Sequence, residues 1–82
     1  MKVRITKNCI RDGERQDKEH CPIGLALFKR GYTEVTVDKQ AVAITHRSGE
    51  VRVLPLSTEA QEFIEAFDDG ETVEPFTLEL HL

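Results

Sequence analysis

The clearest helix signal in the sequence runs from Leu54 to Gly70 and reads LPLSTEAQEFIEAFDDG. Pro55 and Ser57 mark the start of a helix, and Gly70 marks its end. Between these signals, apolar residues recur at the i, i+3, i+4 and i+7 positions that share one helix face. These residues are Ala60, Phe63, Ile64 and Phe67. We therefore predict an amphipathic helix whose apolar stripe joins the core.

The opposite face of this helix is acidic, and the acidity continues beyond it. The predicted partner-binding residues are Glu59, Glu62, Glu65, Asp68, Asp69, Glu71 and Glu74. Residues 1–52 hold all 11 Lys and Arg against seven Asp and Glu, which gives +4. Residues 53–82 hold eight acids and no Lys or Arg, which gives −8. Such a split points to a partner of opposite charge, and a merely solubilising acidic surface is the alternative.

The N-terminal half predicts a strand, a short turn of helix and a buried helix. Residues 2–6 alternate apolar and polar side chains, as a half-buried strand does. Residues 6–13 can form one short helical turn with a Thr cap. Cys21 and Pro22 suit the cap and the first position of a second helix, which Gly31 ends. That helix is apolar nearly all round, so it should be largely buried.

The remaining segments predict strands. Residues 32–38, 41–46 and 51–54 are joined by connections too short for parallel crossovers, so they should form an antiparallel meander. Residues 76–82 alternate cleanly and need a partner, for which the N-terminal strand is the candidate. We therefore predict a single α+β domain over residues 1–82. Its expected architecture is a small mixed sheet, in the order β-α-β-β-β-α-β, with two helices packed on one face.

Several of these motifs resemble a group of small proteins encoded in bacteriophage and prophage sequences of actinobacterial-type genomes. The matching residues are Cys21-Pro22-Ile23-x-Leu25-Ala26-Leu27, Gly31-Tyr32-x-x-Val35-x-Val37, Leu54-Pro55, Phe63-Ile64-x-x-Phe67-Asp68-x-Gly70 and Val73-x-Pro75-Phe76. The resemblance spans residues 21–80 and rests on helix starts, helix stops and a closing strand. It implies an origin in a phage or another mobile element, and it implies no activity and no site residues.

The cysteines and histidines offer two kinds of chemistry. A thiol at a helix N-terminus has a stabilised thiolate, which makes Cys21 the candidate nucleophile or redox residue. A small buried cap is the commoner role for a lone cysteine before proline. A zinc site would need Cys9, His20, Cys21 and one of His46 or His81, and these lack the close pairs of structural zinc sites. We expect no metal and no other cofactor.

Other function classes are disfavoured by what the sequence lacks. It contains no Ser/His/Asp motif, Gly-rich phosphate loop or nucleotide fingerprint, so we expect no enzyme activity. Scattered Lys and Arg, with a pI of about 5.3, argue against direct nucleic-acid binding. No apolar run approaches the ~20 residues of a membrane span, and the N-terminus has no apolar signal region. We expect a cytoplasmic protein without membrane contact.

These observations lead to a functional prediction. We expect a small protein-binding module that uses its acidic surface to bind and inhibit a basic, nucleic-acid-handling host protein. An anti-CRISPR or another anti-defence protein is the class that this describes. The module would act as a monomer or a homodimer. The alternative is a structural or virion-associated homo-oligomer, held together by the exposed edge of the meander or by the terminal strands.

Overall fold

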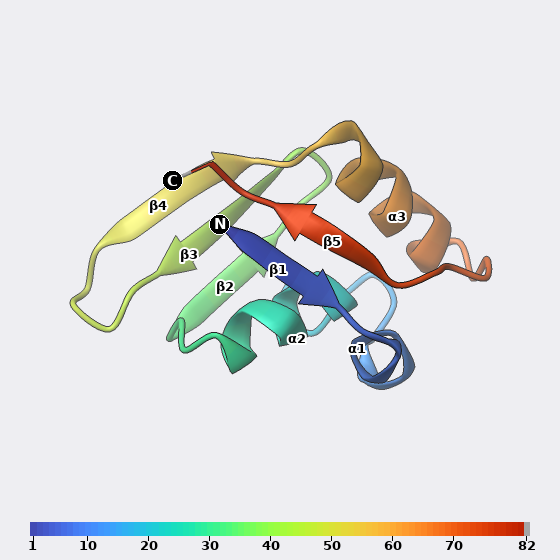
Figure 1. The fold of residues 1–82 in the computed structure, drawn as a ribbon, viewed down its shortest axis with the longest axis horizontal. Helices are drawn as coiled ribbons and strands as arrows, with labels where there is room; N and C mark the ends of the chain where they lie inside the picture. Colours follow the sequence, from blue (N-terminus) through green and yellow to red (C-terminus); the bar gives the residue numbers. More distant parts are fainter. Residues whose placement is uncertain (82) are drawn as a thin grey trace.

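The computed structural model describes residues 1–81 and has eight elements (Figure 1). In chain order these are β1 (Lys2–Ile5), α1 (Lys7–Asp12), α2 (Pro22–Lys29), β2 (Glu34–Val37), β3 (Ala41–Thr45), β4 (Val51–Pro55), α3 (Thr58–Asp68) and β5 (Phe76–Glu79). The α+β class is confirmed, and α1 is the helical turn predicted for residues 6–13. The predicted mixed sheet is replaced by two antiparallel sheets, one of β1 and β5 and one ordered β2-β3-β4.

The two ends of the chain form the smaller sheet, as predicted for the first and last strands. Val3 lies opposite Leu78 in the antiparallel register. Met1 extends this ladder, because its amino group donates to the carbonyl oxygen of Leu80 at 2.7 Å. The N–H of Leu80 returns a bond to the carbonyl oxygen of Met1 at 2.8 Å. The terminal strands bond only to each other, which is why two sheets form instead of one.

The strands β2, β3 and β4 form the antiparallel meander that the short connections predicted. Val35 lies opposite Ile44 and Val42 lies opposite Leu54, and all four side chains are buried. The turn between β3 and β4 contains Gly49 with a φ of 91°. Glycine adopts this left-handed conformation without the steric cost that a Cβ imposes. One face of the meander is therefore buried in the core.

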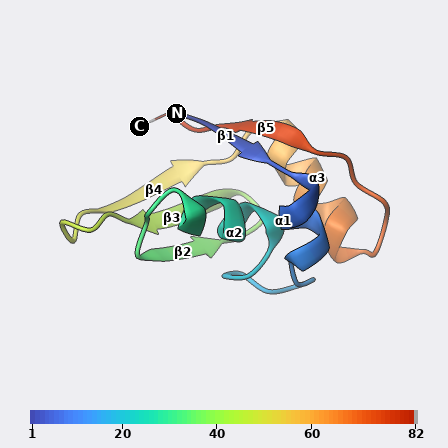
Figure 2. The same ribbon diagram turned by 60° about the horizontal axis from the view of Figure 1, so that its bottom comes forward.

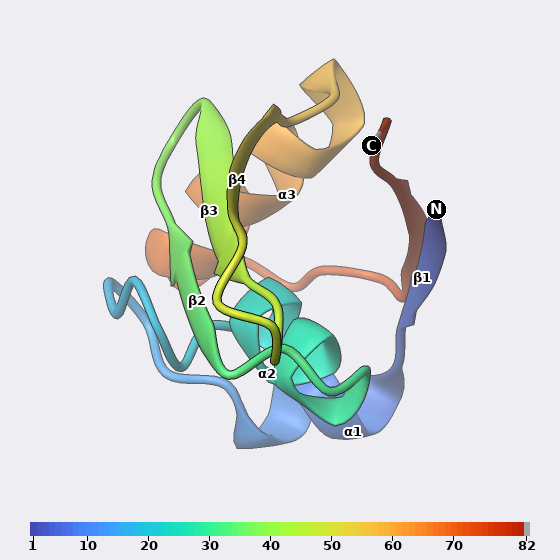
Figure 3. The ribbon, with the colours of Figure 1, turned by 90° about the vertical axis from the view of Figure 1, so that its left-hand side faces the viewer.

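The core lies between the two sheets. Figures 2 and 3 show the β1–β5 sheet across from the meander, with α2 between them. Both α2 and α3 lie on the inner side of the meander, which matches the predicted placement of two helices on one face (Figure 3). The largest fully buried side chains come from both sheets and from α2, and they include Ile5, Ile23, Leu27, Ile44, Leu78 and Leu80.

Helix α2 begins at the cap that the sequence predicted. The Sγ atom of Cys21 accepts a hydrogen bond from the N–H of Gly24 at 3.4 Å, and Pro22 occupies the first helical position. A side chain at Gly24 is excluded by space, since a Cβ there would contact the carbonyl oxygen of Glu19. Gly31 follows the helix with a φ of 100°, which is the left-handed stop that was expected.

Helix α3 is the amphipathic helix predicted from its apolar spacing. The Oγ atom of Ser57 caps it by accepting from the N–H of Ala60 at 3.2 Å, and Gly70 follows its end with a φ of 83°. All four residues of the predicted apolar stripe are buried. The ring of Phe63 lies with its centroid 4.7 Å from that of Phe76 on β5. This aromatic contact ties α3 to the C-terminal strand. None of the helices among residues 1–81 has the length and hydropathy needed to cross a membrane.

We expect Phe63→Ala to lower the free energy of unfolding by about 3 kcal/mol, because it removes a buried ring and leaves a cavity against Phe76. Urea unfolding followed by circular dichroism measures this. The matched control is Glu62→Ala on the exposed face of the same helix, which should change stability by less than about 0.5 kcal/mol. If Phe63→Ala cost no more than the control, α3 would not be anchored through its apolar stripe.

Candidate functional site

Helix α3 and the loop after it carry the seven predicted partner-binding acids. Six of them are exposed, and Asp68 is half-buried. Four ion pairs occur among residues 1–81, and none involves any of the seven. Opposite charges usually neutralise part of a helix surface through neighbours three or four residues away. Here no such ion pair forms within residues 1–81, so the seven acids present a negative surface, called the acidic strip below. The guanidinium of Arg15 lies beside Gly70, between Asp69 and Glu71 in the sequence.

An open groove of about 940 Å³ runs along the C-terminal half of α3. Its other walls are the loop before α2 and the turn between β2 and β3. Among the predicted acids, Glu65, Asp68 and Asp69 line the groove. The other four, Glu59, Glu62, Glu71 and Glu74, lie outside its lining. The predicted residues therefore form one strip along the helix, of which only the C-terminal part borders a concave surface.

Asp68 differs from its neighbours because it holds the opposite wall of the groove. Its Oδ1 atom accepts a hydrogen bond from the backbone N–H of Gln16 at 2.8 Å. Gln16 has a φ of 58°, a left-handed conformation that is uncommon outside glycine. The carboxylate of Asp68 thus fixes a strained point of the loop 52 residues away in sequence. Asp68 has a structural task as well as a negative charge.

Two further acids border the groove and were missed by the sequence analysis. Asp17 and Asp38 line it from the N-terminal half of the chain, together with Lys18 and Lys39. The Oδ1 atom of Asp38 accepts from two backbone N–H groups of the β2–β3 turn, at 2.8 Å and 2.9 Å. These bonds lower the pKa of Asp38 and keep it ionised. An Asp at the start of a turn is the local signal that could have identified it.

Cys21 lies at the groove but is not poised for nucleophilic chemistry. It is 5% exposed, and burial raises the pKa of its thiol. The backbone N–H groups of Gly24 and Ile23 act in the opposite direction and have the smaller effect. A reactive cysteine needs a stabilised thiolate and access to its substrate. The contacts of Cys21 fit the buried-cap role instead.

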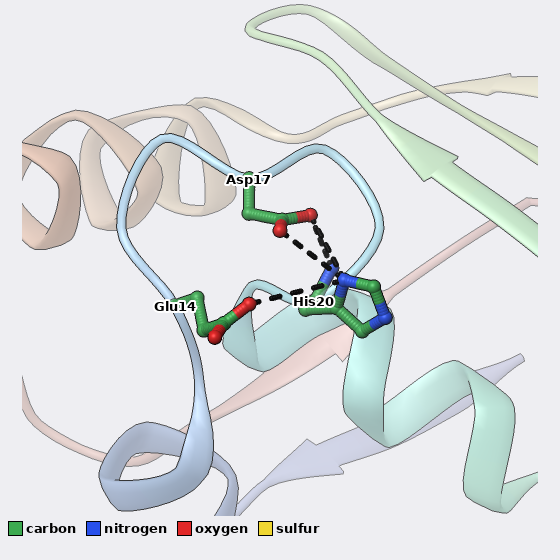
Figure 4. A group of neighbouring side chains, drawn as sticks. All are labelled: Glu14, Asp17 and His20. Carbon is green, nitrogen blue, oxygen red and sulfur yellow. Dashed lines mark hydrogen bonds and ion pairs between the residues drawn. The ribbon is translucent and has the colours of Figure 1, made fainter.

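The loop between α1 and α2 gathers Glu14, Asp17 and His20 (Figure 4). The Nδ1 atom of His20 lies 3.2 Å from both carboxylate oxygens of Asp17 and 3.9 Å from Oε2 of Glu14. Oδ1 of Asp17 also accepts from the N–H groups of Glu19 and His20, both at 2.9 Å. These bonds account for the arrangement without an ion. Within residues 1–81 no other group of three such side chains gathers as closely, so the zinc set considered from the sequence is not brought together.

The same contacts shift the pKa values of Asp17 and His20 in opposite directions. Backbone hydrogen bonds from Glu19 and His20 lower the pKa of Asp17 to about 2. The hydrogen bond to Asp17 raises the pKa of His20 above its ordinary 6.5. The raised His20 pKa stabilises the fold fully below pH 6.5, and this contribution is lost as the pH rises through the raised value. The lowered Asp17 pKa stabilises it above pH 3.8, and this contribution is lost as the pH falls towards about 2.

We expect Asp17→Asn to bring the pKa of His20 down towards its ordinary value, because the substitution removes the negative charge beside Nδ1. A titration of the His20 ring followed by NMR measures the shift. Glu34→Gln is the control, since this exposed acid on β2 makes no ion pair within the described chain. An unchanged pKa of His20 in Asp17→Asn would show that the pair does not form in solution.

Over residues 1–81, the fold that carries these features is an α+β globule with two antiparallel sheets and three helices. No protein-family model, no curated protein and no solved structure matches the chain significantly. The resemblance to phage-encoded proteins stays a prediction from sequence motifs.

Proposed function

We propose that this protein is a non-catalytic binding module whose acidic strip docks on the basic surface of another protein. The observation that carries the proposal is the contrast between the two halves of the chain. In residues 1–52, four of the seven carboxylates form ion pairs with nearby cations: Asp12 with Arg11, Glu14 and Asp17 with His20, and Glu50 with Arg52. The acids of α3 and the following loop form none within the described residues. Apart from Asp68, which accepts a hydrogen bond from Gln16, these acids are exposed and can act on a partner.

The acidic strip also destabilises α3 through repulsion between its like charges. Glu59, Glu62 and Glu65 are spaced three residues apart on α3, and Asp69 follows four residues later. Like charges at these spacings repel each other and destabilise a helix. Only Glu59, in the first turn, is favourably placed against the helix dipole. Soluble surfaces usually intersperse both signs, and a field of one sign suits the steering of a charged partner. The repulsion along α3 therefore supports a binding role.

The partner class follows from the chemistry of the strip. Side chains three or four residues apart on a helix lie about 5–6 Å from one another. A row of carboxylates at this spacing presents regular negative charge, as a nucleic-acid backbone does. Proteins that handle nucleic acids carry basic grooves that attract such a row. We therefore propose a nucleic-acid-handling host protein as the target and inhibition by occupation of its groove as the effect. Together with the phage resemblance, this describes an anti-CRISPR or another anti-defence protein.

The test is affinity capture from a bacterial lysate with the immobilised protein, followed by mass spectrometry of what is retained. We expect basic, nucleic-acid-binding proteins to be retained and to elute as the salt concentration rises, because salt screens the attraction. The triple variant Glu62→Lys, Glu65→Lys and Asp69→Lys should lose them. Asp68 is left intact because it holds the loop at Gln16.

The matched control makes the same change of charge away from α3. Asp12→Lys, Glu19→Lys and Glu34→Lys replace three exposed acids of the N-terminal segment. This variant should retain the same proteins as the wild type. If the triple variant on α3 retained the same proteins with the same salt dependence, the acidic strip would not be the binding surface.

A further inference from the structure

Strand β4 exposes two valines that the fold does not use. Val51 is 63% exposed and Val53 is 68% exposed, and no other large hydrophobic side chain within residues 1–81 is comparably exposed. Both lie on the outer face of the meander, because Leu54 between Val53 and Pro55 points into the core. Both also lie on an edge strand, since β4 bonds only to β3. Apolar side chains on a free strand edge favour pairing with another strand.

The other strand edges are protected. Their exposed residues are polar or charged: Lys2 and Arg4 on β1, Glu34 and Thr36 on β2, and Thr77 and Glu79 on β5. The edge of β2 is also partly covered, since the N–H of Val37 donates to the carbonyl oxygen of Lys18 at 2.7 Å. Charged edge residues and covering loops are the usual devices against edge-to-edge pairing. Only β4 lacks them.

The backbone of β4 has free hydrogen-bonding groups at the two valines. The carbonyl oxygen of Glu50 accepts from the N–H of His46, and the N–H of Leu56 donates to the carbonyl oxygen of Gln40. These bonds place the backbone groups of residues 50, 52, 54 and 56 towards β3. In an antiparallel ladder the intervening residues point the other way. The N–H and C=O groups of Val51 and Val53 therefore face the open edge.

We propose that β4 pairs antiparallel with β4 of a second copy of this chain, with Val51 opposite Val51. In that register Glu50 of each copy lies opposite Arg52 of the other. Glu50 and Arg52 already form an ion pair within one chain at 3.2 Å. The dimer joins both pairs into a ring of four alternating charges, and directly opposed charges of opposite sign stabilise a strand pair.

Charge complementarity selects this register over its neighbours. The register can change only in steps of two residues, because a one-residue step would turn the side chains to the opposite face of the sheet. In a strand paired with its own copy, each such step moves the centre of the pairing by one residue. Centring the pair on Arg52 places Arg52 opposite Arg52, which is repulsive. Centring it on Val53 places Glu50 opposite Leu56 and Arg52 opposite Leu54, so neither charge gains a partner across the contact. The same strand therefore recognises itself best when it is centred on Val51.

The shape of the molecule permits this contact. The β3–β4 hairpin projects from one end of the molecule, and α3 lies towards the other end (Figures 1 and 2). Pairing near the hairpin tip keeps the two bodies and their acidic strips apart. The contact is small, so the dimer should be weak, with a dissociation constant on the order of micromolar or above. It does not depend on the proposed role of the acidic strip, and it gives a specific form to the predicted homodimer.

Disulfide cross-linking tests the register directly. We expect Val51→Cys to form a covalent dimer in oxidised glutathione, because the two thiols face each other within the ~4–7 Å Cα separation of a disulfide. Val53→Cys is the matched control. In this register the two Val53 positions are displaced by four residues, about 13 Å along the strands, so they cannot be bridged. The native Cys9 and Cys21 are buried and are the same in both variants.

A charge exchange tests the ion pairs. Glu50→Arg alone or Arg52→Glu alone makes the ring uniform in sign and should weaken dimerisation at least about tenfold. The double variant Glu50→Arg with Arg52→Glu restores the alternation and should recover dimerisation to within about threefold of the wild type. Sedimentation velocity from about 10 μM to about 1 mM protein measures all four dissociation constants.

Several results would overturn the proposal. A wild-type protein that stays monomeric up to about 1 mM has no such dimer. Equal cross-linking of the two cysteine variants means that the thiols meet by random collision, and preferential cross-linking of Val53→Cys means a different register. Dimerisation that survives both single charge reversals, or that the double variant fails to restore, uses another surface.

Discussion

The fold depends on the pairing of the two chain ends. An 82-residue chain has little material for a core, and the meander and α2 cover only part of it. The β1–β5 ladder supplies the opposite wall, with Val3 and Leu78 buried side by side. Reciprocal bonds between Met1 and Leu80 secure its outer end. Because Phe76 on β5 packs against Phe63, the same ladder also holds α3 in place. The position of the acidic strip therefore depends on the pairing of β1 with β5.

The sequence predicts those features that depend on residues close together in the chain, and it fails where residues far apart in the chain meet. Helix α3 could be predicted in detail, because its Ser57 cap, its apolar spacing and Gly70 all lie within the helix or next to its ends. The partner of β5 could be inferred as the remaining unpaired strand. The division into two sheets could not, since it depends on which edges meet in space. The groove was missed for the same reason, because Asp17 and Asp38 belong to turns that are far from α3 in the sequence and meet it only in the folded chain. The exposure of Val51 and Val53 is set by the register against β3.

The two proposed surfaces share one physical argument. In each, a feature unfavourable to an isolated chain persists where the rest of the structure avoids it. Within residues 1–81, four of the seven carboxylates of residues 1–52 pair with cations, whereas none on α3 does. The exposed side chains are polar on β1, β2 and β5, whereas β4 exposes two valines beside Arg52. A β4-linked dimer would present two acidic strips, and two linked strips bind a repeated or extended basic partner more tightly than one.

Helix α3 builds the core with one face and carries acids without ion-pair partners within residues 1–81 on the other. The most direct test of this arrangement is the dependence of the free energy of unfolding on salt. Between about 20 mM and about 500 mM NaCl, screening should stabilise the wild type. The gain should be about 0.5 kcal/mol or more, and it should shrink in a variant with Glu59, Glu62 and Glu65 replaced by Gln. A wild type that loses more stability than this variant as salt rises would show that these carboxylates are held in attractive pairs. That result would contradict the assignment of repulsive, unpaired charge to this face of α3.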